Sequence, residues 1–185
     1  SLLTNRDDRP WAGWNPRRSD PLPKSEVVDQ WLSCAEMSAA SAETNTLNRL
    51  DLSENDHLLL LHSDTLEGRF CAECLKHFFE RRLRLVESRR IGRLGYGASH
   101  FTAGLKSLVD VVIKSVHEAR NKGKEPLFCA TGGFKAEIAF LNLLGALLGI
   151  EVAYIHELHR ELVRLPLLPL AWDADFVMKH KDFFH

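Results

Sequence analysis

The chain has 185 residues, of which 45% are hydrophobic and 26% charged, as in ordinary soluble globular domains. Its formal net charge of -1 excludes a protein that coats nucleic acid through bulk charge, although a local basic pocket for a small polyanion is compatible with it. No run reaches the roughly 18 apolar residues of a membrane span. The four cysteines fit a reducing cytoplasm, so we expect a cytoplasmic protein, with membrane association only through a flanking segment.

The first third of the chain predicts an irregular start, two helices and a strand. Residues 6–24 are rich in Arg, Asp and Pro and predict a long loop, with its tryptophans packed onto the body. Ser25 is a candidate cap for a helix, and a second helical run covers 39–50. The apolar run Leu58–Leu61, bounded by polar residues, predicts a strand buried on both faces, as in a parallel sheet.

The middle of the chain is dominated by helical patterns. A helix is predicted over 66–83, a short strand over 90–94, and a long amphipathic helix that Thr102 caps and that runs to 121. The arginine-rich stretch 81–93 is compatible with nucleic-acid binding, but the balanced overall charge favours a solvated helix face.

Strands and helices alternate toward the C-terminus. We predict a strand over 127–130, a helix over 135–148 and a last strand over 150–155. This order predicts a Rossmann-like, doubly wound α/β fold with a mainly parallel sheet. Such a sheet normally begins with a buried strand, yet Ser1–Asn5 runs directly into the loop, so the first strand is missing from the pattern or displaced.

Ligands of doubly wound sheets bind outside the carboxyl ends of the strands. Polar residues follow the predicted strands at 62–65, with Ser63 and Thr65, and again at 131–135 and 156–157. These segments are therefore the candidate binding residues.

The segment PLFCATGGFKAE, residues 126–137, is the most informative motif. A strand, a glycine turn and a helix start follow one another, which lets the backbone approach an anion at the positive end of a helix. Lys135 adds a positive charge in the first turn. The segment is neither a P-loop nor a dinucleotide fingerprint, and an ordinary tight turn with a solvated lysine remains an equal alternative.

Two further patterns contain residue types that bind metals or carry redox chemistry, but neither forms a complete site of that kind. Cys71 and Cys74 have CxxC spacing but lie in a predicted helix with no second ligand pair, so we interpret them as buried structural thiols. His62, Asp64 and His156 form no recognised ligand set, and we expect no metal and no cofactor.

Several segments together resemble one family. They are SLLTN at 1–5, SAETNTL at 41–47, HSDTLEG at 62–68, ATGGFKAEIAFLNLLG at 130–145 and IEVAYIHE at 150–157. In this order they resemble the CRISPR-associated Rossmann-fold (CARF) family of type III systems, in its branch of ring nucleases and cyclic-oligoadenylate sensors. LPLLPL at 165–170 resembles the end of that domain, so we predict a domain over 1–172 and a tail over 173–185.

The resemblance implies a homodimer that binds a cyclic oligoadenylate, usually cyclic tetra-adenylate, in type III antiviral signalling. It implies two ligand loops, one formed by Ser1, Leu2, Leu3, Thr4 and Asn5 and the other by Thr131, Gly132, Gly133, Phe134 and Lys135. Ser1 corresponds to a serine implicated in ring cleavage, and Lys135 to a lysine beside the ring phosphates. Tyr96, His100 and Phe101 are compatible with stacking on adenines and equally with packing.

Two functions then stay open, and a weaker third. The protein binds the ring and cleaves it through attack of a 2′-hydroxyl without metal, or it is a sensor that switches a ribonuclease or membrane segment outside this chain. The third is an α/β enzyme acting on a mononucleotide. No DNA partner is expected.

Overall fold

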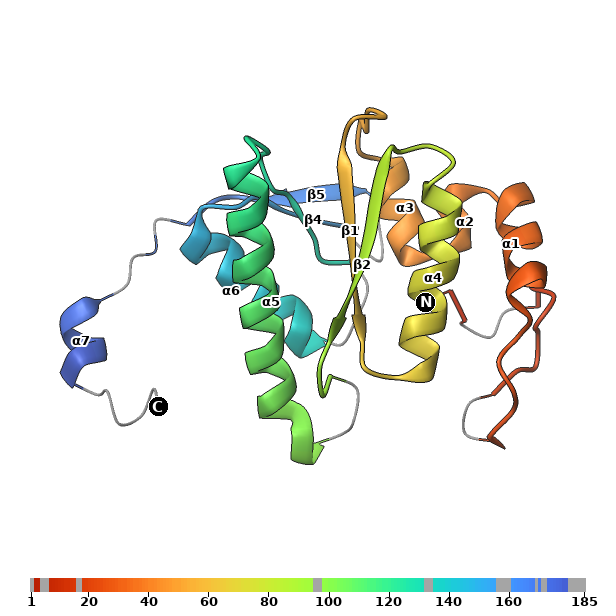
Figure 1. The fold of residues 1–185 in the computed structure, drawn as a ribbon, viewed down its shortest axis with the longest axis horizontal. Coiled ribbons are helices and arrows are strands. Elements are labelled where there is room, and N and C mark those ends of the chain that lie inside the picture. The colour runs from red at the N-terminus through yellow and green to blue at the C-terminus, as the bar shows by residue number, and fades with distance from the viewer. Residues whose placement is uncertain are drawn as a thin grey trace.

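The computed structural model describes residues 2–3, 7–15, 18–94, 98–131, 135–155, 161–168, 170 and 173–179. Helices surround two small sheets, and each sheet contains a pair of parallel strands (Figure 1). This arrangement confirms the predicted Rossmann-like α/β class.

The two sheets differ in strand direction. The strands are β1 (His57–Ser63), β2 (Leu85–Ile91), β3 (Phe128–Cys129), β4 (Val152–Ile155) and β5 (Leu162–Leu165). The first sheet pairs β1 with β2 in parallel, from His57 opposite Leu85 to Ser63 opposite Ile91. The second has the order β3-β4-β5, with β3 parallel and β5 antiparallel to β4.

Helices connect the strands and cover the sheets. They are α1 (Ser25–Cys34), α2 (Met37–Ala40), α3 (Ala42–Asn48), α4 (Leu66–Phe79), α5 (Phe101–Asn121), α6 (Lys135–Leu148) and α7 (Ala174–Lys179). Helix α4 packs on both strands of the first sheet, whereas α3 contacts β3 and β4. Helix α5 contacts both β2 and α6, and α7 lies at the opposite end of the molecule from α1 (Figure 1).

Within the described residues, no strand joins the two sheets. β1 pairs only with β2 there, and β3 only with β4. Leu58–Leu60 are only half-buried and Leu61 is 36% exposed, so the prediction of a strand buried on both faces is wrong.

Local boundaries also differ from the prediction. The run over 39–50 is split at Ser41, whose extended backbone ends α2. Ser41 and Thr44 then form a capping box that starts α3. Neither Ser25 nor Thr102 is a cap, because the residues that precede α1 and α5 are Lys24 and His100, without side-chain cap hydrogen bonds.

The arginine-rich stretch is a strand rather than a helix face. β2 spans 85–91, so the predicted strand at 90–94 was placed too late. Val86 and Ile91 are buried while the residues between them are partly or fully exposed, which charged side chains tolerate on an edge strand. The strand β5 and the helix α7 were not predicted, since both are short and lack a clear periodicity.

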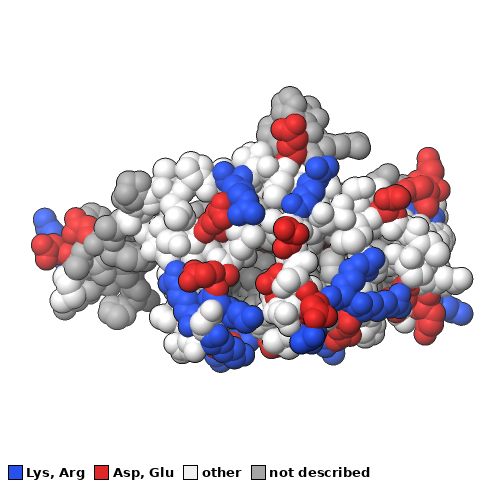
Figure 2. Space-filling view, turned by 90° about the horizontal axis from the view of Figure 1, so that it is seen from above, with Lys and Arg blue, Asp and Glu red and all other residues white. Residues whose placement is uncertain are grey.

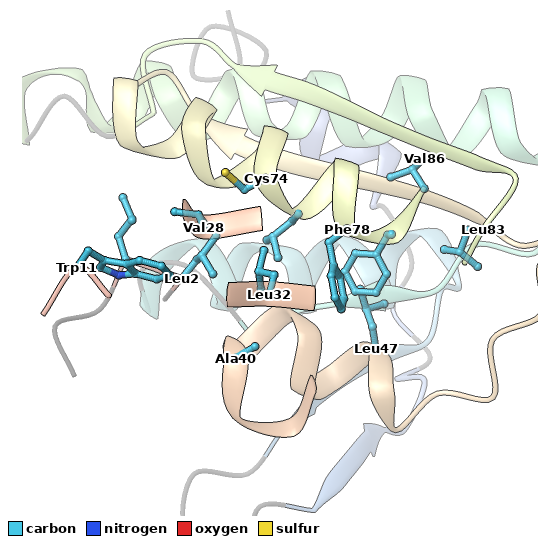
Figure 3. Close-up of a cluster of buried hydrophobic side chains, with 13 residues drawn as sticks. Leu2, Trp11, Val28, Leu32, Ala40, Leu47, Cys74, Phe78, Leu83 and Val86 are labelled. Atoms are coloured by element: carbon cyan, nitrogen blue, oxygen red, sulfur yellow. The ribbon is translucent and has the colours of Figure 1, made fainter. Parts of the chain in front are cut away.

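Two clusters of buried side chains form the core. The first lies between α4 and the N-terminal helices and includes Leu32, Leu47 and Phe78 (Figure 3). The second lies around α5 and α6 and includes Leu105 and Leu144.

A buried arginine attaches the irregular N-terminal segment to the first cluster. Arg9 is 5% exposed, and its guanidinium donates to the carbonyl of Leu2 and, at 2.9 Å, to that of Ala40. It also lies 5.3 Å from the ring centre of Trp31. Trp11 is 6% exposed, which confirms that a tryptophan of the loop packs on the body.

We predict that Gly145→Ala lowers the stability of the fold. A Cβ at this position in α6 would lie 2.5 Å from Val152 Cγ2 and 2.9 Å from the carbonyl oxygen of Ile150. That backbone cannot move freely, because the Ile150 N–H donates to the Gly145 carbonyl at 2.8 Å. Overpacking costs about 1–3 kcal/mol, whereas alanine recovers at most about 1 kcal/mol of helix propensity.

Urea unfolding measures this effect. Gly92→Ala is the control, because its Cβ would meet nothing closer than Ser107 Oγ at 3.8 Å. Equal unfolding midpoints for the two variants would contradict the packing of α6 on β4.

Candidate functional site

The predicted anion-binding turn begins where β3 ends. The ladder with β4 continues one residue beyond the strand, since the Ala130 N–H donates to the Ala153 carbonyl at 2.9 Å. Thr131 follows, and its Oγ1 accepts the backbone N–H of Ile155 at 3.3 Å. The first residue of the turn is therefore attached to the carboxyl end of the neighbouring strand.

A second hydroxyl group reaches Thr131 from α3. Thr46 is completely buried, and its Oγ1 lies 2.5 Å from Thr131 Oγ1 across 85 residues of sequence. In the sequence, SAETNTL stands out only as part of the family resemblance, and Thr46 has no predicted role. Its only local signal is a polar residue among the buried positions of a short helix, which does not reveal its partner.

Helix α6 begins at Lys135, which confirms the predicted strand and helix on either side of the glycine segment. Gly132, Gly133 and Phe134 lie outside the described residues, and so does the side chain of Lys135. The positive end of the dipole of this 14-residue helix lies at its N-terminus, at Lys135. Glu137 is an acidic residue in the same first turn.

Ser63 and Thr65 stand at the carboxyl end of β1. Thr65 is the N-cap of α4, because its Oγ1 accepts the Gly68 N–H at 3.0 Å, and it lies 3.0 Å from Ser63 Oγ. Gly68 makes room for this pair, since a Cβ there would lie 2.2 Å from Ser63 Oγ. These hydroxyl groups hold the turn after β1, whereas Thr131 belongs to a separate network with α3 and β4.

The carboxylate of Asp64, in the same turn, is hydrogen-bonded to β2 and to the loop after it. Its carboxylate accepts from Arg90 Nη1 at 3.1 Å and from the Arg93 N–H at 3.2 Å. His62 contacts the Ser63 carbonyl through Nδ1 at 2.9 Å. In the part of the chain that the structure describes, no three His, Cys, Asp or Glu side chains gather as a metal site.

Leu2 and Leu3, predicted in the first ligand loop, lie in the core. Both side chains are buried in the first core cluster, in which Figure 3 shows Leu2. A ligand contact by these two residues would therefore use the backbone. The other predicted members of this loop, Ser1, Thr4 and Asn5, lie outside the described residues, as do Tyr96, His156 and Glu157.

The CxxC cysteines are structural. Cys74 is buried and Cys71 half-buried on α4, and both are free thiols. Burial raises the pKa of Cys71 to about 11 and that of Cys74 to about 12, so both are protonated near neutral pH. Protonated thiols are poor nucleophiles and poor metal ligands.

Charges of both signs alternate on the surface. Lysine, arginine, aspartate and glutamate are interspersed on the face of Figure 2. A recess over β2 and α5 is lined by Arg89, Arg90, Lys114 and Glu118. Its arginines are already paired, Arg89 with Glu118 at 2.5 Å and Arg90 with Asp64 at 3.1 Å, so it is not a free anion site.

No helix within the described ranges is long and apolar enough to cross a membrane.

The fold and the turn after β3 define an α/β protein of the Rossmann-like class with a candidate ligand site at the carboxyl edge of its strands. A family model described as CRISPR-associated protein (Cas_APE2256) matches residues 34–168, well over half of the chain. The chain therefore belongs to this CRISPR-associated family. The matched region contains α3, both turns and β4, and it begins after SLLTN. A search of curated proteins found no match.

We predict that Cys34 reacts with a thiol reagent in the native protein at pH 8 long before Cys71 or Cys74 does. Cys34 is exposed at the end of α1. With a pKa of about 11, the thiolate fraction of Cys71 at pH 8 is on the order of one in a thousand, and that of Cys74 is lower still. Mass spectrometry of peptides after timed iodoacetamide labelling measures the order. Rapid native labelling of Cys74 would contradict its burial, whereas unfolding in urea should expose all three thiols.

Proposed function

We propose that this CRISPR-associated protein binds a cyclic oligoadenylate as a homodimer in type III antiviral signalling, with cyclic tetra-adenylate as the preferred ring. The observation that carries the proposal is the turn after β3. Thr131 is held by α3 and β4, and a 14-residue helix starts four residues later at Lys135.

The chemistry of this turn suits an RNA ring. Free N–H groups and the dipole at the start of a helix bind phosphate oxygens, and glycines allow close approach of the backbone. Lys135 adds a cation, whose hydrogen bonds to phosphate oxygens are charge-assisted. In a homodimer, two such turns related by a two-fold axis match a ring of repeated adenylates.

Two outcomes of binding follow from the resemblance to the CARF family. In a ring nuclease, a 2′-hydroxyl attacks the adjacent phosphorus, the new 2′-O–P bond forms, and the 5′-oxygen leaves with a proton. Positioning and a cation such as Lys135 can support this step, with Ser1 or Thr4 orienting the phosphate. In a sensor, the ring stays intact and the bound state switches an effector outside this chain.

We predict that Lys135→Ala weakens binding of cyclic tetra-adenylate by at least about tenfold, because it removes a charge-assisted contact. Titration calorimetry measures the affinity, and chromatography of a labelled ring separates intact from linear products. Lys122→Ala is the matched control, since Lys122 is exposed at the end of α5, before β3 begins.

The same samples distinguish a ring nuclease from a sensor. Linear di-adenylate that disappears in Lys135→Ala supports the nuclease, and tight binding without turnover supports the sensor. Absence of binding to any cyclic oligoadenylate by the unaltered protein would overturn the proposal.

A further inference from the structure

We propose that Thr46 is a positioning residue of this site, which fixes the hydroxyl of Thr131 so that its proton is donated to a bound phosphate. The inference rests on the proposed function for its ligand. Its structural part, that Thr46 orders Thr131 at the end of β3, stands on the contacts of the protein alone.

The hydroxyl group of Thr46 lies within hydrogen-bond distance of two oxygens but has only one proton to donate. Thr46 Oγ1 lies 3.0 Å from the Ala42 carbonyl in its own helix and 2.5 Å from Thr131 Oγ1. A hydroxyl group donates one hydrogen bond and accepts up to two. Thr46 can therefore donate to only one of these two oxygens at a time.

The roles of the other partners are fixed. The Ala42 carbonyl only accepts, and the Ile155 N–H only donates, in this case to Thr131 Oγ1 at 3.3 Å. Only the two threonine hydroxyl groups can exchange the roles of donor and acceptor with each other. Without a ligand, Thr131 can donate to Thr46, which donates to Ala42, and each hydroxyl proton then has an acceptor.

A phosphate oxygen beside Thr131 favours the opposite arrangement. Thr131 then donates its proton to the anion, and Thr46 turns its own proton to Thr131. Thr131 Oγ1 still accepts from both Thr46 and Ile155, so its position is unchanged while its proton faces the ligand. The Ala42 carbonyl faces the N–H of Thr46 one helical turn later, so losing the hydroxyl costs little there.

Burial makes this arrangement stable. Thr46 is 0% exposed, so water does not compete for its proton. A hydrogen bond to a charged acceptor is worth more than one between neutral groups, which favours the donating state of Thr131 when a phosphate is present.

The test compares three variants. Thr46→Val keeps the shape and removes the hydroxyl group, and Thr46→Ser restores it. Thr44→Val is the matched control, because Thr44 is equally buried in α3, but its Oγ1 donates to the Met37 carbonyl at 2.7 Å and accepts the Ser41 N–H at 2.8 Å. It therefore loses a comparable group without touching the turn.

We expect Thr46→Val to weaken binding of cyclic tetra-adenylate about tenfold, and Thr46→Ser to bind as the unaltered protein does. Thr44→Val should lower the melting temperature and leave the affinity unchanged when both are measured well below melting. Unchanged affinity in Thr46→Val, or an equal loss of affinity in Thr44→Val, would overturn the role of Thr46 in binding.

Hydrogen exchange without ligand tests the structural part independently. In Thr46→Val the Ile155 amide and the peptide over 130–137 should exchange about threefold faster or more, with no such change in Thr44→Val. If the protein binds no ring but this acceleration is found, the proposed ligand fails and the ordering role of Thr46 stands. If exchange is unchanged, the ordering role fails whatever the ligand.

Discussion

The constraint on which the rest of the structure depends is that, among the described residues, the two sheets share no hydrogen-bonded ladder and are held together by side-chain packing. Within the described residues, β1 and β2 share no ladder with β3, β4 and β5. Helix α5 packs between β2 and α6, and α3 packs on β3 and β4 while its residue Leu47 belongs to the first core cluster. Side-chain packing is sensitive to small changes in volume, so the relative placement of the two strand ends depends on these helices.

The hydroxyl contact between Thr46 and Thr131 belongs to the same junction. It links α3 directly to the turn in which a ligand is proposed to bind, and the Ile155 N–H links that turn to β4. A shift of Thr131 would therefore change a hydrogen bond of α3, the helix that also contributes to the first core cluster. Such a connection suits a protein whose ligand carries a signal, whether or not the ligand is cleaved.

The charged groups of this protein act through local contacts rather than through a large net charge of the whole molecule. The net charge is close to zero, and the arginines of β2 are paired with Asp64, Glu87 and Glu118. The proposed affinity for an RNA ring accordingly rests on a single turn, a helix start and Lys135. Membership of a CRISPR-associated family gives the protein a biological setting.

The sequence by itself determined the α/β class and the positions of β1, β3, β4 and α6, because periodicity, glycine and apolar runs are local signals. It misplaced β2, since an edge strand rich in arginine resembles a solvated helix face. Only the tertiary structure decided that Leu2 and Leu3 fill the core and that Thr46 meets Thr131. Those facts depend on contacts between segments far apart in sequence, which no local pattern records.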